Sequence, residues 1–203
     1  MTSDTMPKTI RQLAGIAPVI PRFADAVLIL IDEQSEYVDG PLKLAGIAEA
    51  NAINVSILKA ARASGASIVH IAQKGTSGGP FDRSAHRGAF IADVSPVDGE
   101  PVVEKTFASA FASTSLDDVL AKIGRKSLII VGYMTHNCVT GTSFDAVARG
   151  HSVTVISDAT ATRDLPDGDG GVVKAADLQR AQLAGLSDRQ ALVITLEALL
   201  AAQ

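Results

Sequence analysis

The chain has 203 residues, 47% hydrophobic and 20% charged, which is enough to bury one core, so we predict a single domain over residues 1–203 with an N-terminal arm over 1–22. A net charge of −4 and an aromatic content of 4% give neither a basic surface nor stacking side chains, and we expect no nucleic-acid partner. One cysteine, no secretory pattern and no apolar run of about 18–20 residues predict a cytoplasmic protein that does not enter membranes.

The first half of the chain alternates between strand and helix patterns. The run from Ala26 to Asp32 is continuously apolar before its final carboxylate, as in parallel strands covered on both sides. A helix is predicted over 43–65 and a second strand over 67–72. Residues 73–100 are rich in glycine and proline and predict a long loop, a feature that is usually functional or mobile.

The second half continues the same alternation. A short extended segment over 101–105 precedes a helix over 115–124, for which Ser115 is the expected N-cap. We then expect a strand over 127–132, a helix over 138–150, a strand over 152–158, a turn-rich loop over 164–171, a helix over 172–186, a strand over 191–195 and a helix over 197–203. The pattern predicts an α/β fold of three α/β/α layers, Rossmann-like, with a mainly parallel sheet of five or six strands.

Three reactive side chains follow three of these strands. Asp32 ends the first strand, Lys105 ends the short extended segment, and Cys138 begins the helix after the fourth strand. Because the carboxyl ends of parallel strands share one edge of a sheet, all three converge on the expected ligand crevice. A lone cysteine is more often an inert core residue, Asp32 could be a structural cap, and most lysines are solvated.

The same residues also suit nucleophilic chemistry. A nearby ammonium and a helix N-terminus would lower the pKa of the Cys138 thiol below its free value of about 8.5. Asp32 could take the thiol proton and return it to a leaving amine.

Four ordered segments carry a family resemblance. They are AVLILIDEQSEYVDG, VVEKTFASAFASTSL, SLIIVGYMTHNCVTGTSFDA and GHSVTVISDATATRD. With them, nearly the whole chain after about Phe23 resembles the isochorismatase-like cysteine hydrolases, which include nicotinamidases, carbamoylsarcosine-type amidases and streptothricin hydrolase-like proteins. The order and intervals of several motifs make this resemblance specific.

The resemblance implies a role for each matching position. Cys138 would form a thioester, Asp32 would act as general base and acid, and Lys105 would hold charge and geometry. A non-proline cis peptide would lie between Tyr133 and Met134, and the main-chain N–H groups of Met134 and Cys138 would form an oxyanion hole. The residues expected to bind substrate are Gln34, Tyr37, Phe111 and His136.

The presence of Cys138 favours hydrolysis of a carbon–nitrogen bond in a small-molecule amide, lactam or carbamoyl compound. Hydrolysis of the vinyl ether of isochorismate, which does not need a thiol, and non-catalytic ligand binding remain alternatives. Metal-containing nicotinamidases carry an Asp-x-His pair that this chain lacks; its His70 and His86 are weak evidence for a metal, and we expect no metal or cofactor. The family implies a homo-oligomer, and the apolar arm APVIPRF is a candidate contact.

Overall fold

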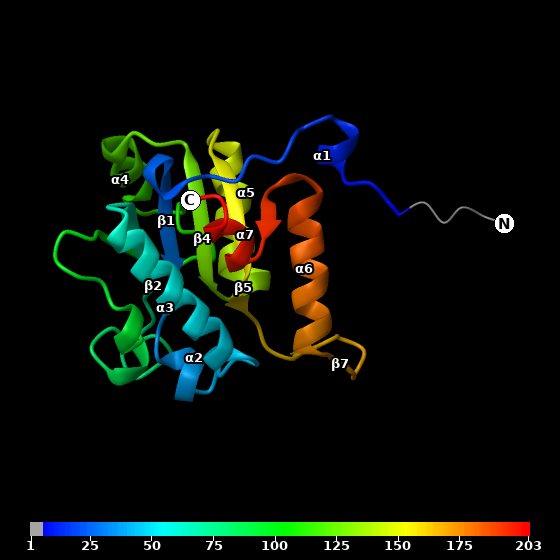
Figure 1. The fold of residues 1–203 in the computed structure, drawn as a ribbon. Helices are drawn as coiled ribbons and strands as arrows, with labels where there is room; N and C mark the ends of the chain where they lie inside the picture. The colour runs from blue at the N-terminus through cyan, green and yellow to red at the C-terminus, as the bar shows by residue number, and fades with distance from the viewer. Residues whose placement is uncertain (1–5) are drawn as a thin grey trace.

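A computed structural model describes residues 6–203 and is built around one parallel sheet (Figure 1). Its strand order is β3-β2-β1-β4-β5-β8, and every neighbouring pair is parallel. The strands are β1 (Ala26–Ile31), β2 (Ser67–Gln73), β3 (Val102–Lys105), β4 (Ser127–Tyr133), β5 (Ser152–Ala161) and β8 (Leu192–Ile194). The predicted parallel sheet of five or six strands is therefore confirmed.

Strand β1 lies at the centre because all six of its side chains are apolar and buried. Val27, Ile29 and Ile31 point into the core on one face of the sheet, whereas Leu28 and Leu30 point into the core on the other. A strand with no polar face is stable only when helices cover both of its sides.

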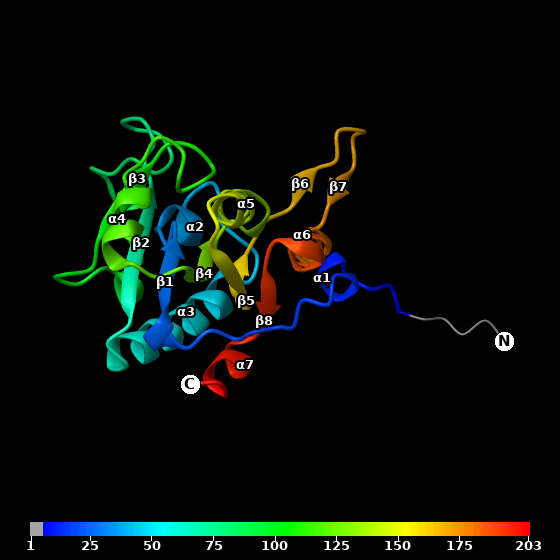
Figure 2. The same ribbon diagram turned by 90° about the horizontal axis from the view of Figure 1, so that it is seen from above.

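The helices supply these two covering layers (Figure 2). Helices α4 (Leu116–Ile123), α5 (Thr140–Ala148) and α6 (Ala175–Arg189) pack on the face of Val27 and Ile29. Helices α3 (Ile47–Ala63) and α7 (Leu196–Leu200) pack on the other. The three-layer α/β/α prediction is confirmed.

The remaining elements are short. They are α1 (Ile10–Leu13), α2 (Glu36–Asp39), the 3-10 turns η1 (Phe23–Asp25), η2 (His86–Gly88) and η3 (Ala92–Val94), the π-helical turn η4 (Thr135–Val139), and the strands β6 (Leu165–Pro166) and β7 (Val172–Val173). No helix within residues 6–203 is both long and apolar enough to cross a bilayer.

Some local predictions were wrong. Ser115 stands at the predicted N-cap position of α4 but makes no side-chain capping bond; the Thr114 hydroxyl accepts from the Leu116 N–H at 3.2 Å instead. The loop predicted over 164–171 joins an antiparallel pair, β6 and β7. The helix predicted from Cys138 begins earlier, at Thr135, as the turn η4.

The N-terminal arm runs along the outside of the fold. Of the predicted span 1–22, residues 1–5 lie outside the described residues. Helix α1 packs near α6, and the Ile10 N–H donates to Asp188 at 2.8 Å. Leu13, Ile16 and Val19 are exposed. Contact of this arm with a second copy of the chain stays a prediction, which a size measurement in solution would test.

Candidate active site

Asp32, Lys105 and Cys138 meet at the carboxyl-terminal edge of the sheet. Lys105 Nζ lies 2.7 Å from Asp32 Oδ2 and 3.2 Å from Cys138 Sγ. All three residues are buried, and Cys138 is 3% exposed. Asp32 follows β1, Lys105 ends β3 and Cys138 lies in η4 beyond β4, so the parallel topology brings together residues more than a hundred positions apart.

The backbone changes direction at Asp32, the first residue after β1. Its φ of 52° lies in the left-handed region, which aspartate tolerates better than most residues. Its N–H still donates to Ile71 on the neighbouring strand β2, at 3.0 Å. Asp32 therefore leaves the ladder without losing its backbone hydrogen bond.

The Lys105 ammonium is held from further directions. It donates to Gln73 Oε1 at 2.6 Å and to the Phe107 carbonyl at 3.2 Å. Gln34 in turn fixes Gln73, because its side chain donates to the Gln73 carbonyl at 3.0 Å and accepts from the Gln73 N–H at 2.8 Å. Gln34 also donates to the Gly88 carbonyl and so ties the 73–100 loop to the site.

The electrostatics of the site differ from the sequence-based expectation. Burial and, after it, the charge of Asp32 together raise the pKa of the Cys138 thiol to about 12, and Lys105 only partly opposes them. Burial also raises the pKa of Asp32, against the attraction of Lys105. Burial lowers the pKa of Lys105, but Asp32 and Cys138 outweigh this effect and raise it. The resting thiol is therefore protonated, and the prediction of a lowered pKa was wrong.

The chain needs a glycine where β4 enters the site. Gly132 has a φ of 103° at a shift in the β4–β5 register. A Cβ there would overlap the Ile31 carbonyl oxygen and lie 2.7 Å from the Ile31 nitrogen. The next peptide bond, Tyr133–Met134, is cis, as the family resemblance implies. These residues lead directly into η4, which carries Cys138.

A cavity of about 230 Å³ opens onto the Cys138 thiol. The side chains that line it are apolar or polar but uncharged. They come from α2 and the loop after it, the ends of β2 and β3, the 73–100 loop and η4. The lining residues are Tyr37, Leu42, Gln73, Phe81, Thr106, Phe107, Ala108, Met134, Asn137 and Cys138.

Of the four residues predicted to bind substrate, Tyr37 lines this cavity and three do not. Gln34 is fully buried in the clamp described above. Phe111 points into the core, with the Arg149 guanidinium 4.7 Å from its ring centre. His136 Nδ1 lies 2.6 Å from the Thr162 hydroxyl, and burial lowers the pKa of its imidazole.

The sequence interpretation missed most of the lining. Phe107 could have been predicted to line the site, because it follows Lys105 by only two positions. Phe81 and Leu42 come from loops, whose path the sequence pattern does not specify.

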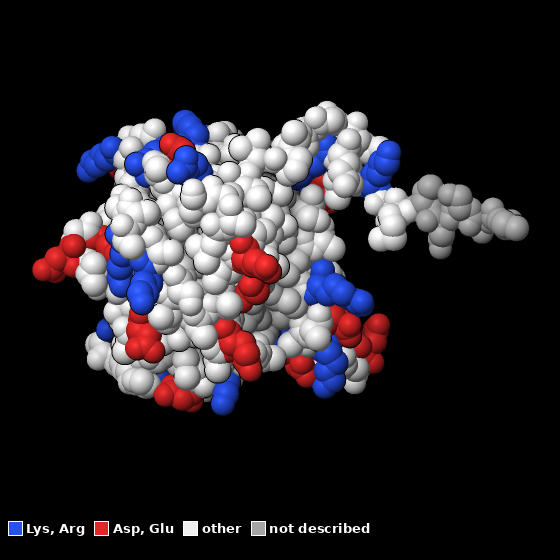
Figure 3. All heavy atoms as spheres, in the orientation of Figure 1, with Lys and Arg blue, Asp and Glu red and all other residues white. Residues whose placement is uncertain are grey.

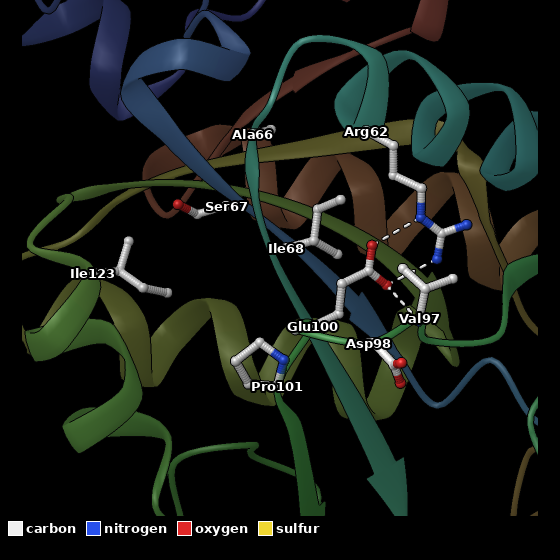
Figure 4. Close-up of a pocket in the computed structure, with 10 residues that line it drawn as sticks. Arg62, Ala66, Ser67, Ile68, Val97, Asp98, Glu100, Pro101 and Ile123 are labelled. Atoms are coloured by element: carbon white, nitrogen blue, oxygen red, sulfur yellow. Dashed lines mark hydrogen bonds and ion pairs between the residues drawn. The ribbon is translucent and has the colours of Figure 1, made fainter.

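A larger cavity, about 380 Å³, lies at the opposite edge of the sheet (Figure 4). Two of its lining side chains are paired: Arg62 donates twice to the Glu100 carboxylate at 2.8 Å, and Glu100 also lies 2.8 Å from His70 Nε2. Figure 4 shows the Glu100 carboxylate directed at Arg62 and at the main chain of Val97. His70 is thus a buried residue that contacts Glu100, and it does not line the cavity at Cys138.

Other predicted site features fall elsewhere. His86 is exposed and lies 2.8 Å from Asp39. Across residues 6–203, no three His, Cys, Asp or Glu side chains are grouped so that they could hold a metal ion. On the face drawn in Figure 3, Lys and Arg are interspersed with Asp and Glu and form no basic stripe.

Comparison with known proteins gives consistent matches. The isochorismatase domain model matches residues 26–198. A secreted isochorismatase effector of Verticillium dahliae is 37% identical over 88% of this chain and 92% of its own length. A streptothricin hydrolase of Streptomyces noursei is 32% identical over 89% of this chain and 70% of its own. The crystal structure of an isochorismatase from Pseudomonas putida KT2440 superposes with a TM-score of 0.91 at 40% identity, covering 95% of this chain and 99% of that one. Since the first of these relatives is named as secreted, the cytoplasmic location stays a prediction.

Proposed function

Because the chain belongs to the isochorismatase family, whose members are hydrolases, we propose that it hydrolyses a carbon–nitrogen bond of a small molecule with Cys138 as nucleophile. The observation that carries this proposal is the position of the thiol. It opens onto a cavity and lies 3.2 Å from the Lys105 ammonium, which is itself 2.7 Å from the Asp32 carboxylate. The thiol thus has a carboxylate nearby that can accept its proton and an ammonium that can stabilise the resulting thiolate.

The first half of the reaction forms a thioester. As Sγ of Cys138 attacks the carbonyl carbon, its proton passes to Asp32 and the carbonyl π electrons move to the oxygen. The Lys105 ammonium stabilises the sulfur as it loses its proton, and the N–H groups of Met134 and Cys138 are the proposed donors to the oxyanion. The carbon–nitrogen bond then breaks, and the amine leaves with the proton that Asp32 held.

The second half restores the enzyme. A water molecule attacks the thioester carbon while Asp32 takes one of its protons. The carbon–sulfur bond breaks, the acid leaves, and the proton on Asp32 returns to Cys138. Each amide consumed with one water gives one acid and one amine, so the step needs no oxidant or other co-reactant.

A second candidate comes from the names of two relatives. Both the Verticillium dahliae protein and the Pseudomonas putida structure are called isochorismatase, which favours cleavage of a vinyl ether. The retained thiol favours the carbon–nitrogen bond, because ether hydrolysis has no use for a sulfur nucleophile. The products separate the two: an amide releases ammonia or an amine, and isochorismate releases pyruvate.

The test combines turnover with the single cysteine. We expect ammonia release from at least one member of a panel of small primary amides, loss of that release in Cys138→Ser, and an acyl adduct on Cys138 by mass spectrometry after acid quench. Iodoacetamide should inactivate the protein, since Cys138 is its only thiol. Ammonia release that survives in Cys138→Ser, or pyruvate from isochorismate with no ammonia from any amide, would contradict the proposal.

A further inference from the structure

Over residues 6–203, the cavity at Cys138 has no charged side chain in its lining. Among the described residues, no Asp, Glu, Lys, Arg or His lines it. The walls are made by Tyr37, Leu42, Phe81, Phe107 and Met134, and the polar groups are the uncharged side chains of Gln73, Thr106 and Asn137. Burial and nearby anions raise the pKa of Tyr37 well above its ordinary value, so its phenol is neutral.

Lys105 does not supply a charge for a ligand. Its ammonium is buried, and its neighbours are Asp32 at 2.7 Å, Gln73 at 2.6 Å, the Phe107 carbonyl at 3.2 Å and Cys138 at 3.2 Å. An ammonium has three N–H donors, and these four neighbours occupy them. The carboxylate of Asp32 also cancels its charge.

Most other cations near this edge are paired with carboxylates. In each pair the carboxylate neutralises the cation, so the pair leaves no net positive charge for a ligand. The pairs are Arg87 with Glu36 at 2.6 Å, Arg83 with Glu104 at 3.2 Å and Lys74 with Glu104 at 2.9 Å.

Arg163 is close enough to lower the pKa of His136, yet it does not line the cavity. Its guanidinium donates to the Asp164 carbonyl at 3.3 Å. Its charge also lowers the pKa of Tyr37 in the cavity wall, so Arg163 lies near the cavity without lining it.

A charged ligand would be poorly matched to such walls. Moving a carboxylate from water into a site without a cation costs at least several kcal/mol. The size limits the ligand as well, since a cavity of about 150 Å³ already accepts benzene and drug-sized ligands need about 300 Å³ or more. At about 230 Å³, this cavity takes one small ring or a short unsaturated chain.

We infer that the substrate is a compact, uncharged carboxamide, lactam or imide, and that carboxylate-bearing molecules, isochorismate included, are rejected by the cavity. This inference rests on the proposed function and deepens it. In this proposal, specificity comes from apolar walls that, among the described residues, carry no charged side chain, and not from a cation that binds a substrate carboxylate.

Matched pairs of substrates test it. Maleamide and maleamate differ only by an amide in place of a carboxylate, as do phthalamide and 2-carboxybenzamide. We expect kcat/KM for ammonia release, measured at pH 7.5, to be at least 100-fold higher for the uncharged member of each pair. Equal values, or a preference for the anion, would overturn the inference while leaving hydrolysis by Cys138 intact. Absence of Cys138-dependent ammonia from all four would count against the proposed function instead.

A binding measurement decides the inference even without turnover. Benzamide in the cavity should slow alkylation of Cys138 by iodoacetamide, and benzoate at the same concentration should not. Better protection by benzoate would overturn the inference, whatever the hydrolysis assays show.

A charge added to the wall should reverse the preference. Phe107 is 57% exposed, so Phe107→Arg places a cation at the cavity without disturbing the core. We expect the maleamide-to-maleamate ratio of kcat/KM, or of protection constants, to fall at least tenfold. Phe144→Arg is the control, because Phe144 is 49% exposed on α5 and does not line the cavity. An unchanged ratio in Phe107→Arg would contradict the inference.

Discussion

Lys105 Nζ and Asp32 Oδ2 lie 2.7 Å apart, and both side chains are completely excluded from solvent. Buried charges of this kind are stable only as a pair, because removing one partner leaves the other uncompensated at a cost of about 3–5 kcal/mol. The Cys138 thiol shares this environment, 3.2 Å from the same nitrogen. In the proposed reaction, proton transfer from sulfur to Asp32 takes place inside this preformed, nearly neutral cluster.

Asp32→Asn should separate thiol reactivity from catalysis. The Asp32 charge raises the pKa of the thiol, so its removal lowers that pKa from about 12 and speeds alkylation of Cys138 by iodoacetamide at pH 8. Amide hydrolysis should fall by about 10²–10⁴-fold, because the general base is lost. The rate of alkylation against pH, followed by mass spectrometry, gives the first result and ammonia release the second.

Asp39→Asn is the matched control, since Asp39 is an exposed carboxylate on α2. It should change neither measurement. If alkylation and hydrolysis both slowed in Asp32→Asn, Asp32 would be holding the thiol in place rather than accepting its proton.

Gly132→Ala should unfold or severely destabilise the protein. The new methyl group would overlap the Ile31 carbonyl in the centre of the sheet, and the φ of 103° is unfavourable for any L-residue. We expect a loss of about 3 kcal/mol or more in the free energy of unfolding, measured in urea. Gly150→Ala is the control, because Gly150 has a φ of 80° but open space around its Cα, and its loss should be about 1–2 kcal/mol. Equal losses of unfolding free energy in the two variants would show that the positive φ, and not the overlap with the Ile31 carbonyl, causes the destabilisation.

The sequence predicted the residues at strand ends but not the orientation of their neighbours. Asp32, Lys105 and Cys138 could be placed at one edge because parallel topology fixes where strands end. Gln34 and Phe111 sit in the same motifs, yet they turn inward, and only tertiary packing decides that. The raised pKa of Cys138 was missed for a similar reason: a motif shows that Lys105 is near, but not how deeply the thiol is buried.

Glu100 should stabilise the fold down to acidic pH. Although burial opposes ionisation, hydrogen bonds from Arg62, Val97 and His70 lower the pKa of Glu100 from 4.5 to about 2. A carboxylate whose pKa is lower in the folded state stabilises it above the unfolded pKa, and this contribution is lost as the pH falls from about 4.5 towards 2. Its size is on the order of 3 kcal/mol. The free energy of unfolding of Glu100→Gln, measured in urea, should thus lie below that of the wild type by a constant amount at pH 5–7. This difference should shrink between pH 4.5 and 3, and a difference that does not change with pH would contradict the lowered pKa of Glu100.

Glu33 should have the opposite pH dependence. It follows Asp32 directly and is fully buried, and neither of its carboxyl oxygens has a hydrogen-bond partner among the described residues. Burial, with a further contribution from the Asp32 charge, raises its pKa well above 4.5, so the folded protein holds this proton to a higher pH than the unfolded chain does. The folded state then binds a proton that the unfolded state releases, and stability falls as the pH rises above about 4.5.

Glu33→Gln has the shape of the protonated acid and cannot ionise, so it removes this dependence. We expect the difference in unfolding free energy between Glu33→Gln and the wild type to shift in favour of the variant as the pH rises from 5 to 8, by up to about 1.4 kcal/mol per pH unit. Glu49→Gln, an exposed substitution on α3, should show no such gain. Parallel stability curves for Glu33→Gln and the wild type across this range would mean that Glu33 ionises in the folded protein, and that the cluster around Asp32 holds a second negative charge.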